Sequence, residues 1–161
     1  MRITRLLAVP LAAIALVAAF AACAPIKSGP APSLSFDAAH PQAQELYHLV
    51  NADRAAHGLG PVHWNDQLGG LAQNWSNHQA ANGSLQHQNL QAILESPGYG
   101  HFSGMGENVL TGECGTSAAQ MHQAWMNSPP HRANILGNFN AIGIGIACGG
   151  GSVYATQDFA R

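Results

Sequence analysis

The sequence predicts an α+β domain, because two kinds of hydrophobic periodicity follow each other along the chain. Three segments before residue 128 carry apolar side chains three and four positions apart, as amphipathic helices do. Residues 142–159 instead alternate apolar with small or polar side chains, which is typical of strands. Helices first and a strand pair last predict helices packed on an antiparallel sheet, since every element must bury its apolar face.

The first helix is expected over Gln44–His57. Leu46, Leu49 and Val50 recur at the spacing that places apolar side chains on one stripe of a helix. Gly58 follows, and glycine is typical just beyond a helix end. One face of this helix is therefore expected to be buried.

The second helix is expected to begin after Asn65, whose side chain can cap the first turn. Asn82-Gly83 ends it, because glycine readily takes the left-handed conformation that closes helices. Its inward stripe contains Leu68, Leu71, Ala72, Trp75 and Gln79. We interpret Trp75, together with Trp64 and Trp125, as a core residue, since all three lie at or beside helical apolar positions.

The third helix is expected to begin near Ser117, because Ser117 and Gln120 have the spacing of a capping box. Pro129-Pro130 should break it, since proline inside a helix removes a hydrogen bond and clashes with the preceding turn. A short helical turn over His131–Leu136 then precedes the strands.

The last part of the chain is expected to form a β-hairpin. Ile142–Ile146 alternates isoleucine with glycine, and Val153–Phe159 is a second strand. Gly149–Gly151 joins the two strands. Because glycine has no side chain, the glycine face of the first strand would allow a helix backbone to approach closely.

The first 23 residues are predicted to be an export signal. Arg2 and Arg5 precede the uncharged stretch Leu6–Ile26, which is rich in alanine and has the small residues Ala21-Ala22 at the signal's exit. The alternative is a retained membrane helix, since the uncharged stretch is long enough to span a bilayer. Pro10 and the small-residue exit favour the signal.

Cys23 completes a sequence, Phe20-Ala21-Ala22-Cys23, that resembles a bacterial lipobox, although phenylalanine stands where leucine is usual. The chain has three cysteines, and an exported protein with an odd number must account for the unpaired one. Lipidation of Cys23 accounts for it and leaves Cys114 and Cys148 to pair. The alternative is ordinary cleavage after residue 21 or 22, which would leave a free thiol near the new N-terminus.

A disulfide between Cys114 and Cys148 would close a loop over residues 115–147. The chain-entropy model gives such a loop about 4 kcal/mol of stability. Two reduced, buried thiols are the alternative, but an exported protein favours the disulfide.

Residues 24–41 are predicted to be an extended tether, because they are rich in proline, glycine and serine. With Cys23 lipidated, the tether would join the membrane's outer face to a domain over residues 42–161. Without lipidation, the protein would be secreted. We expect a monomer.

The charge balance argues against nucleic acid as a partner. Six Lys and Arg face eight Asp and Glu, for a net charge of −2, and the basic residues form no cluster. Nucleic-acid binding relies on a concentration of positive charge that this sequence lacks.

An ordered set of short motifs resembles the CAP superfamily of cysteine-rich secretory, venom-antigen and pathogenesis-related proteins. The motifs are NADRAAHGL (51–59), VHWNDQL (62–68), His87, GENV (106–109), WMNSPPHRANIL (125–136), IGIG (142–145) and YATQDF (154–159). Each motif alone is weak, but in this order they cover nearly all of residues 43–160. The resemblance implies a three-layer α-β-α sandwich with a small antiparallel sheet.

The resemblance also implies a cleft lined by two histidines and acidic residues. Carried over to this chain, the binding cleft contains His87, Glu107, Ser128 and His131. Ser128 stands where many relatives carry the second acid, so one negative charge is missing. His87, Glu107 and His131 are adequate ligands for Zn²⁺ or a similar divalent cation, bound weakly. The alternative is a hydrogen-bonded scaffold without a ligand.

Three functions are consistent with these residues, of which the resemblance implies the first. The favoured one is an exported binding module of the bacterial envelope for a divalent cation and for a lipid or other small hydrophobic ligand. The second is a hydrolase acting on peptide or cell-wall substrates through a Ser128–His131 pair or a metal-bound hydroxide. Against a serine hydrolase, the sequence lacks a Gly-x-Ser-x-Gly nucleophile motif. The third is an envelope interaction protein whose cleft is inactive.

Overall fold

The computed structural model describes residues 31–161. The predicted export signal, with Cys23, and the first part of the predicted tether lie outside these residues. Within residues 31–161, no helix is both long enough and apolar enough to cross a membrane. The described part contains the whole predicted domain and the last residues of the predicted tether.

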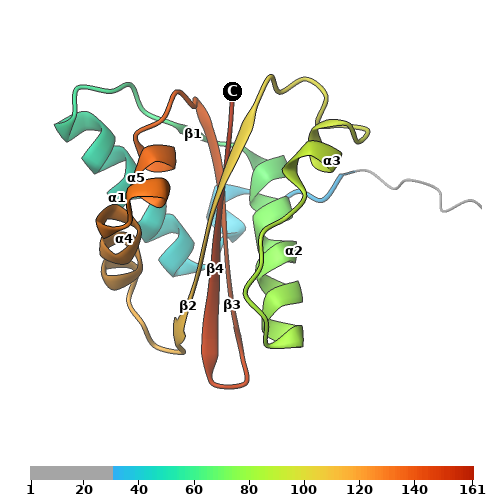
Figure 1. The fold of residues 1–161 in the computed structure, drawn as a ribbon, viewed down its shortest axis with the longest axis vertical. Helices are drawn as coiled ribbons and strands as arrows, with labels where there is room; N and C mark the ends of the chain where they lie inside the picture. The colour runs from blue at the N-terminus through green and yellow to red at the C-terminus, as the bar shows by residue number, and fades with distance from the viewer. Residues whose placement is uncertain (1–30) are drawn as a thin grey trace, which may run out of the picture.

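Helices cover both faces of a four-stranded sheet (Figure 1). α1, α4 and α5 lie on one face, and α2 and α3 lie on the other. In chain order the elements are η1 (Phe36–Ala38), α1 (Pro41–Ala56), β1 (His63–Trp64), α2 (Asp66–Asn82), α3 (Leu90–Leu94), β2 (Met105–Glu113), α4 (Ala118–Asn127), α5 (Pro129–Ile135), β3 (Ala141–Gly149) and β4 (Ser152–Ala160). The predicted α+β class and the α-β-α sandwich are confirmed.

Local sequence signals set the helix ends as expected. The side chain of Asn65 accepts hydrogen bonds from two backbone N–H groups in the first turn of α2, both at 3.0 Å. Gly83 closes α2 in the left-handed conformation, with φ 62°. Ser117 and Gln120 form the predicted capping box of α4.

Two helix boundaries differ from the prediction. α1 begins at Pro41 rather than Gln44, because proline suits the first helical position, where no N–H donor is needed. For the same reason Pro129-Pro130 opens α5 as well as ending α4, so this helix starts before His131. The short elements η1, β1 and α3 were not predicted, because segments of three, two and five residues show no periodicity.

The strand order in the sheet is β1-β3-β4-β2. β3 and β4 form the predicted hairpin, which turns through Gly150 and Gly151 at positive φ. β2 pairs antiparallel with β4, and Glu107 lies directly opposite Asp158. β1 pairs parallel with β3, so the sheet is not wholly antiparallel as expected. β2 is an edge strand, and both helical layers can reach it.

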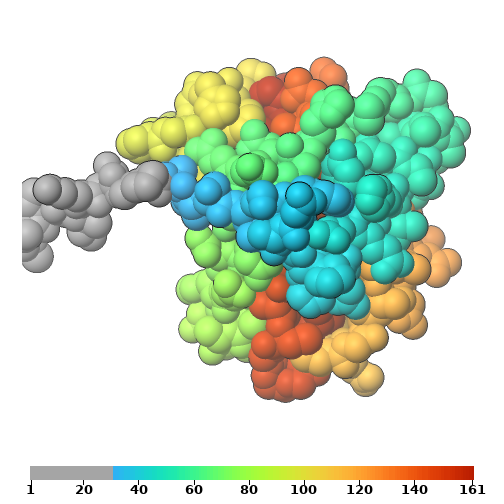
Figure 2. Space-filling model, turned by 180° about the vertical axis from the view of Figure 1, so that it is seen from behind, coloured from blue at the N-terminus to red at the C-terminus, as the bar shows by residue number. Residues whose placement is uncertain are grey.

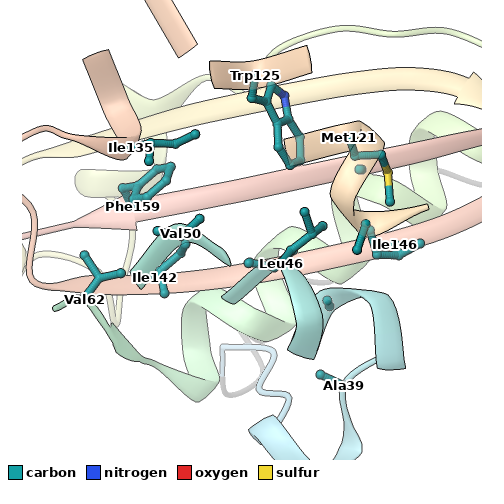
Figure 3. Close-up of a cluster of buried hydrophobic side chains, with 14 of the residues drawn as sticks. Ala39, Leu46, Val50, Val62, Met121, Trp125, Ile135, Ile142, Ile146 and Phe159 are labelled. Carbon is teal, nitrogen blue, oxygen red and sulfur yellow. The ribbon is translucent and has the colours of Figure 1, made fainter. Parts of the chain in front are cut away.

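The face of the sheet under α1, α4 and α5 carries the main apolar core (Figure 3). Trp125 of α4 and Phe159 of β4 are fully buried there, and both are among the largest buried side chains. Other members of this core include Leu46, Val50, Val62, Met121, Ile135, Ile142 and Ile144. The apolar stripes predicted for α1 and α4 therefore do face the sheet.

The opposite face of the sheet approaches the backbone of α2. A β-carbon added to Gly143 would overlap the backbone of Leu68 and Gly69, and one added to Gly145 would overlap Ala72. The predicted close approach of a helix to the glycine face is confirmed.

The last residues of the predicted tether pack on the domain. The backbone N–H of Leu34 donates to the carbonyl of Asp66 at 2.7 Å, and Trp64 donates its indole N–H to the carbonyl of Leu34 at 3.0 Å. Gly70 of α2 has no room for a β-carbon because the backbone of Pro32 lies against it. Figure 2 shows this segment, in blue, lying across α2 in green. Packing therefore begins upstream of residue 42.

The predicted disulfide between Cys114 and Cys148 is present, with a Cα–Cα distance of 5.9 Å. Cys114 directly follows β2, and Cys148 lies near the end of β3. The bond therefore links the two strands that flank β4, at the end of the sheet where the hairpin turns.

Candidate functional site

The candidate site begins with a contact between His87 and Glu107. His87 lies in the loop between α2 and α3, and its Nδ1 is 2.5 Å from Oε1 of Glu107 on β2. The Glu107 side chain is 1% exposed, whereas that of His87 is 61% exposed. Because an ionised carboxylate only accepts hydrogen bonds, Nδ1 carries the proton. In the neutral form of the ring, the lone pair is then on Nε2.

Gln88 holds the carboxylate of Glu107 from two directions. Its backbone N–H donates to Oε1 at 3.1 Å, and its side-chain amide donates to Oε2 at 2.8 Å. The same amide nitrogen lies 3.0 Å from both carboxylate oxygens of Asp158. Rotation of the amide by 180° would place its oxygen against the carboxylate of Glu107, so this contact favours the orientation with nitrogen toward Glu107.

Asp158 is a second acid beneath the site. It is fully buried on β4, opposite Glu107. Burial raises its pKa well above the ordinary value, the charge of Glu107 raises it further, and the hydrogen bond from Gln88 opposes both. A protonated Asp158 avoids placing two buried negative charges side by side. Burial and Asp158 also raise the pKa of Tyr99, whose buried hydroxyl has no hydrogen-bond partner within residues 31–161.

His131 reaches the same edge strand from the opposite helical layer. Burial lowers the pKa of His131, and the positive charge of a protonated His87 would lower it further, so both favour the neutral form of His131. Asn108 of β2 donates to the carbonyl of His131 at 3.1 Å. Asn134 donates to the carbonyl of Glu107 at 3.0 Å and to the side-chain oxygen of Asn108 at 2.9 Å. These bonds fix α5 against β2.

Ser128 lies between α4 and α5 and is half-buried. Its side chain forms no hydrogen bond with His131 or any other group in the described part of the chain. The arrangement therefore lacks the serine–histidine hydrogen bond of a serine nucleophile. In residues 31–161, no three His, Cys, Asp or Glu side chains gather closely enough to form a ready-made metal site.

Arg54 and Asn51 have structural roles beside the site. Arg54 is 4% exposed and donates to the carbonyls of Gly60, Ile135, Gly137 and Phe139 at 2.8–3.1 Å. Asn51 accepts from the backbone N–H of Val62 and donates to its carbonyl. Both side chains therefore satisfy loop groups that have no partner in the sheet.

Two members of this network, Gln88 and Asp158, were not predicted from the sequence. A signal for Asp158 was present, because alternation along Val153–Phe159 places it on the same face as Thr156, under α2. Gln88 left no such signal, since it lies in a loop that has neither periodicity nor a motif.

A family model described as the cysteine-rich secretory protein family, CAP, matches residues 47–159. This chain belongs to the CAP family. The resemblance inferred from the ordered motifs is confirmed.

Individual relatives agree with the family match. The uncharacterised Bacillus subtilis protein YkwD is 30% identical over 126 residues, which cover 71% of this chain and 45% of YkwD. This CAP chain therefore spans less than half the length of that relative.

Solved structures show the same fold. An extracellular SCP-domain protein from Bacillus anthracis is 27% identical with a TM-score of 0.64, over 83% of this chain and 45% of that one. An outer surface protein from Borrelia burgdorferi has a TM-score of 0.66 at 18% identity, over 74% and 92% of the two chains. The family is described as one of secretory proteins, and the relative from Bacillus anthracis is described as extracellular.

Proposed function

We propose that this CAP protein is an exported binding module of the bacterial envelope, and that it holds a divalent cation such as Zn²⁺ between His87 and His131. One observation carries the proposal, the 2.5 Å contact between Nδ1 of His87 and Oε1 of Glu107. A carboxylate in this position fixes the tautomer and orientation of a metal-binding histidine and increases its basicity. The ring nitrogen left free, Nε2, belongs to a ring that is largely exposed.

His131 supplies the second nitrogen. Burial lowers the pKa of His131, which favours the neutral imidazole that metal binding requires. In this proposal Glu107 orients His87 instead of serving as a third ligand, because its two oxygens already accept three hydrogen bonds. Two protein ligands leave the remaining positions to water, so we expect weak binding.

The envelope location is supported by the N-terminal sequence and by the relatives. The apolar segment that follows Arg2 and Arg5 has the features of an export signal. The family is one of secretory proteins, and the relative from Bacillus anthracis is extracellular. A lipid on Cys23 would retain the exported domain at the outer face of the cell membrane.

Zn²⁺ titration of the purified full-length protein by isothermal calorimetry at pH 7.5 tests the cation site. We expect one weak site, which His87→Ala and His131→Ala each abolish. Glu107→Gln should weaken binding by about 10- to 100-fold, as loss of a metal ligand's carboxylate partner does. His63→Ala is the matched control, because His63 is exposed on β1, at the opposite edge of the sheet. If all four variants bind Zn²⁺ with the affinity of the wild type, the metal binds elsewhere.

A further inference from the structure

A pocket of about 390 Å³ lies at the C-terminal end of α1 and shares no residue with the candidate cation site. Two loops form its walls, one joining α1 to β1 and the other joining α5 to β3, and both lie toward the top of Figure 1. Among the described residues that line the pocket, Arg54 in the last turn of α1 is the only charged one. The pocket therefore contains a single positive charge.

The guanidinium of Arg54 has one N–H group more than its partners use. It carries five N–H donors. Nε donates to the carbonyl of Gly60, and Nη1 donates to those of Ile135 and Gly137. Nη2 donates to the carbonyl of Phe139, and its second N–H has no acceptor within residues 31–161. Because Arg54 lines the pocket, a ligand there can accept this hydrogen bond without displacing a loop carbonyl.

The positive charge of Arg54 has no carboxylate partner in the described part of the chain. The ion pairs there join His87 to Glu107 and His122 to Asp53. Burial lowers the pKa of Arg54, but a guanidinium stays protonated in proteins. The four loop carbonyls are neutral dipoles, so they offset the cost of burying the charge only in part. An anion in the pocket would supply the negative charge that the protein does not.

A second cation lies near this pocket. Arg132 is exposed on α5, one helical turn before the lining residue Leu136. Its Nη2 is 2.9 Å from Nε2 of His57, and no acid pairs with it within residues 31–161. The same residues contain only three Lys or Arg side chains, at positions 54, 132 and 161. Two of the three therefore lie where α1 and α5 end, and their charges attract anions to this part of the surface.

The uncharged part of the lining matches the end of a peptide better than a bare anion. Leu59, Leu136 and Phe139 supply apolar surface for a side chain. Asn138 and Asn140 are exposed, and their side-chain amides form no hydrogen bond with any described residue. Because an amide both donates and accepts, these two groups can pair with a peptide bond. The chain of a fatty acid would cover the amides without bonding to them.

We propose that this pocket binds the C-terminal carboxylate of a peptide. The carboxylate accepts the remaining N–H of Arg54, the last side chain packs on the apolar wall, and the last peptide group bonds to Asn138 and Asn140. One N–H donor and one buried charge match a monoanion, whereas phosphate is usually held by several charge-assisted bonds. The proposal goes beyond the cation site and does not depend on it.

NMR titration of the ¹⁵N-labelled full-length protein with N-acetyl-alanyl-leucine tests the proposal. We expect saturable shifts of the backbone amides of Gly60 and Gly137 with one common midpoint. The C-terminal amide of the same dipeptide lacks the negative charge, so it should bind at least about tenfold more weakly. Arg54 itself is retained, because its replacement would leave four loop carbonyls without a donor.

Adding a negative charge to the lining tests the electrostatic part of the proposal. Asn138→Asp should weaken binding of the dipeptide by about tenfold, because the new carboxylate repels that of the ligand. Asn74→Asp is the matched control, since it makes the same change at an exposed position on α2, on the other face of the sheet. This control should bind the dipeptide with the affinity of the wild type.

Three results would overturn the proposal. The first is equal affinity for the dipeptide and its amide, and the second is unchanged affinity in Asn138→Asp. The third is a titration without saturable shifts at Gly60 and Gly137. Hexanoate, which has the carboxylate but no peptide group, should bind more weakly than the dipeptide. Equal or tighter binding of hexanoate would show that the pocket takes simple carboxylates, and the peptide proposal would be wrong.

Discussion

The two faces of the sheet are packed by different means. Under α1, α4 and α5, large apolar side chains such as Trp125 and Phe159 fill the space. Under α2, glycines bring the helix backbone onto the strands, and buried polar groups lie between them. Ser76 and Gln79 of α2 both contact the Thr156 hydroxyl, at 3.0 and 3.2 Å.

Alternation along the strands causes this difference. On β4, Phe159 points to the apolar face and Asp158 to the polar one, and Glu107 on β2 shares the polar face. On the apolar face, under α1, α4 and α5, the close packing of large side chains stabilises the fold. The polar face presents a carboxylate to a loop histidine at the sheet edge, so the candidate site depends on that face.

The largest expected effect comes from adding a side chain to a strand glycine that lies against the backbone of α2. Gly143→Val should prevent folding, because its side chain would overlap the backbone of Leu68 and Gly69, which no rotamer change can relieve. Circular dichroism and the yield of oxidised monomer measure this effect. A soluble variant with wild-type unfolding behaviour would show that α2 does not lie on this strand.

Truncation on the apolar face should cost less. Phe159→Ala leaves a cavity where a fully buried ring packs against Phe139 and should lower the free energy of unfolding by about 3–5 kcal/mol. Urea denaturation measures this loss. A change below about 1 kcal/mol would mean that this face is loosely packed.

The disulfide links strands at one end of the sheet and is part of neither packed face. Its loss should therefore lower the stability of the whole domain. Replacing Cys114 and Cys148 together by serine should lower the free energy of unfolding by about 2–4 kcal/mol, chiefly through the unfolded state. Zn²⁺ affinity should stay unchanged. A large loss of Zn²⁺ affinity in this variant would contradict the separation between scaffold and site.

The smallest effect is a change in pH dependence from Asp158→Asn. Because the pKa of Asp158 is raised in the folded state, its contribution to stability is complete below the unfolded pKa of about 3.9 and is lost as pH rises through the folded value. Asparagine resembles the protonated acid, so the variant should gain stability relative to the wild type over the pH range above the unfolded pKa of aspartate. Parallel stability curves over that range would exclude a protonated Asp158.

The sequence predicted the elements whose signals are local. Asn65, Gly83 and the capping box at Ser117 set helix ends through contacts within one turn, so their roles follow from residue type and spacing. The glycine alternation after Ile142 predicted both a strand and the close approach of a helix.

The site was predictable only in part, because its members come together through tertiary structure. His87 and His131 could be named from the family motifs, but the motifs do not show that Glu107 bonds to His87. The role of Gln88 depends on two acids that meet only when β2 pairs with β4. The half-buried position of Trp75 was missed because helical spacing indicates a face without showing how far its neighbours cover it.

An anomalous-scattering crystal structure with Zn²⁺ tests the central claim most directly. We predict one peak within bonding distance of Nε2 of His87 and a ring nitrogen of His131, with Glu107 still bonded to His87 and Gln88. A peak bound directly by Glu107 would restore the three-ligand site expected from the sequence. No peak at this edge of the sheet, or a peak at other histidines, would contradict the proposed cation site.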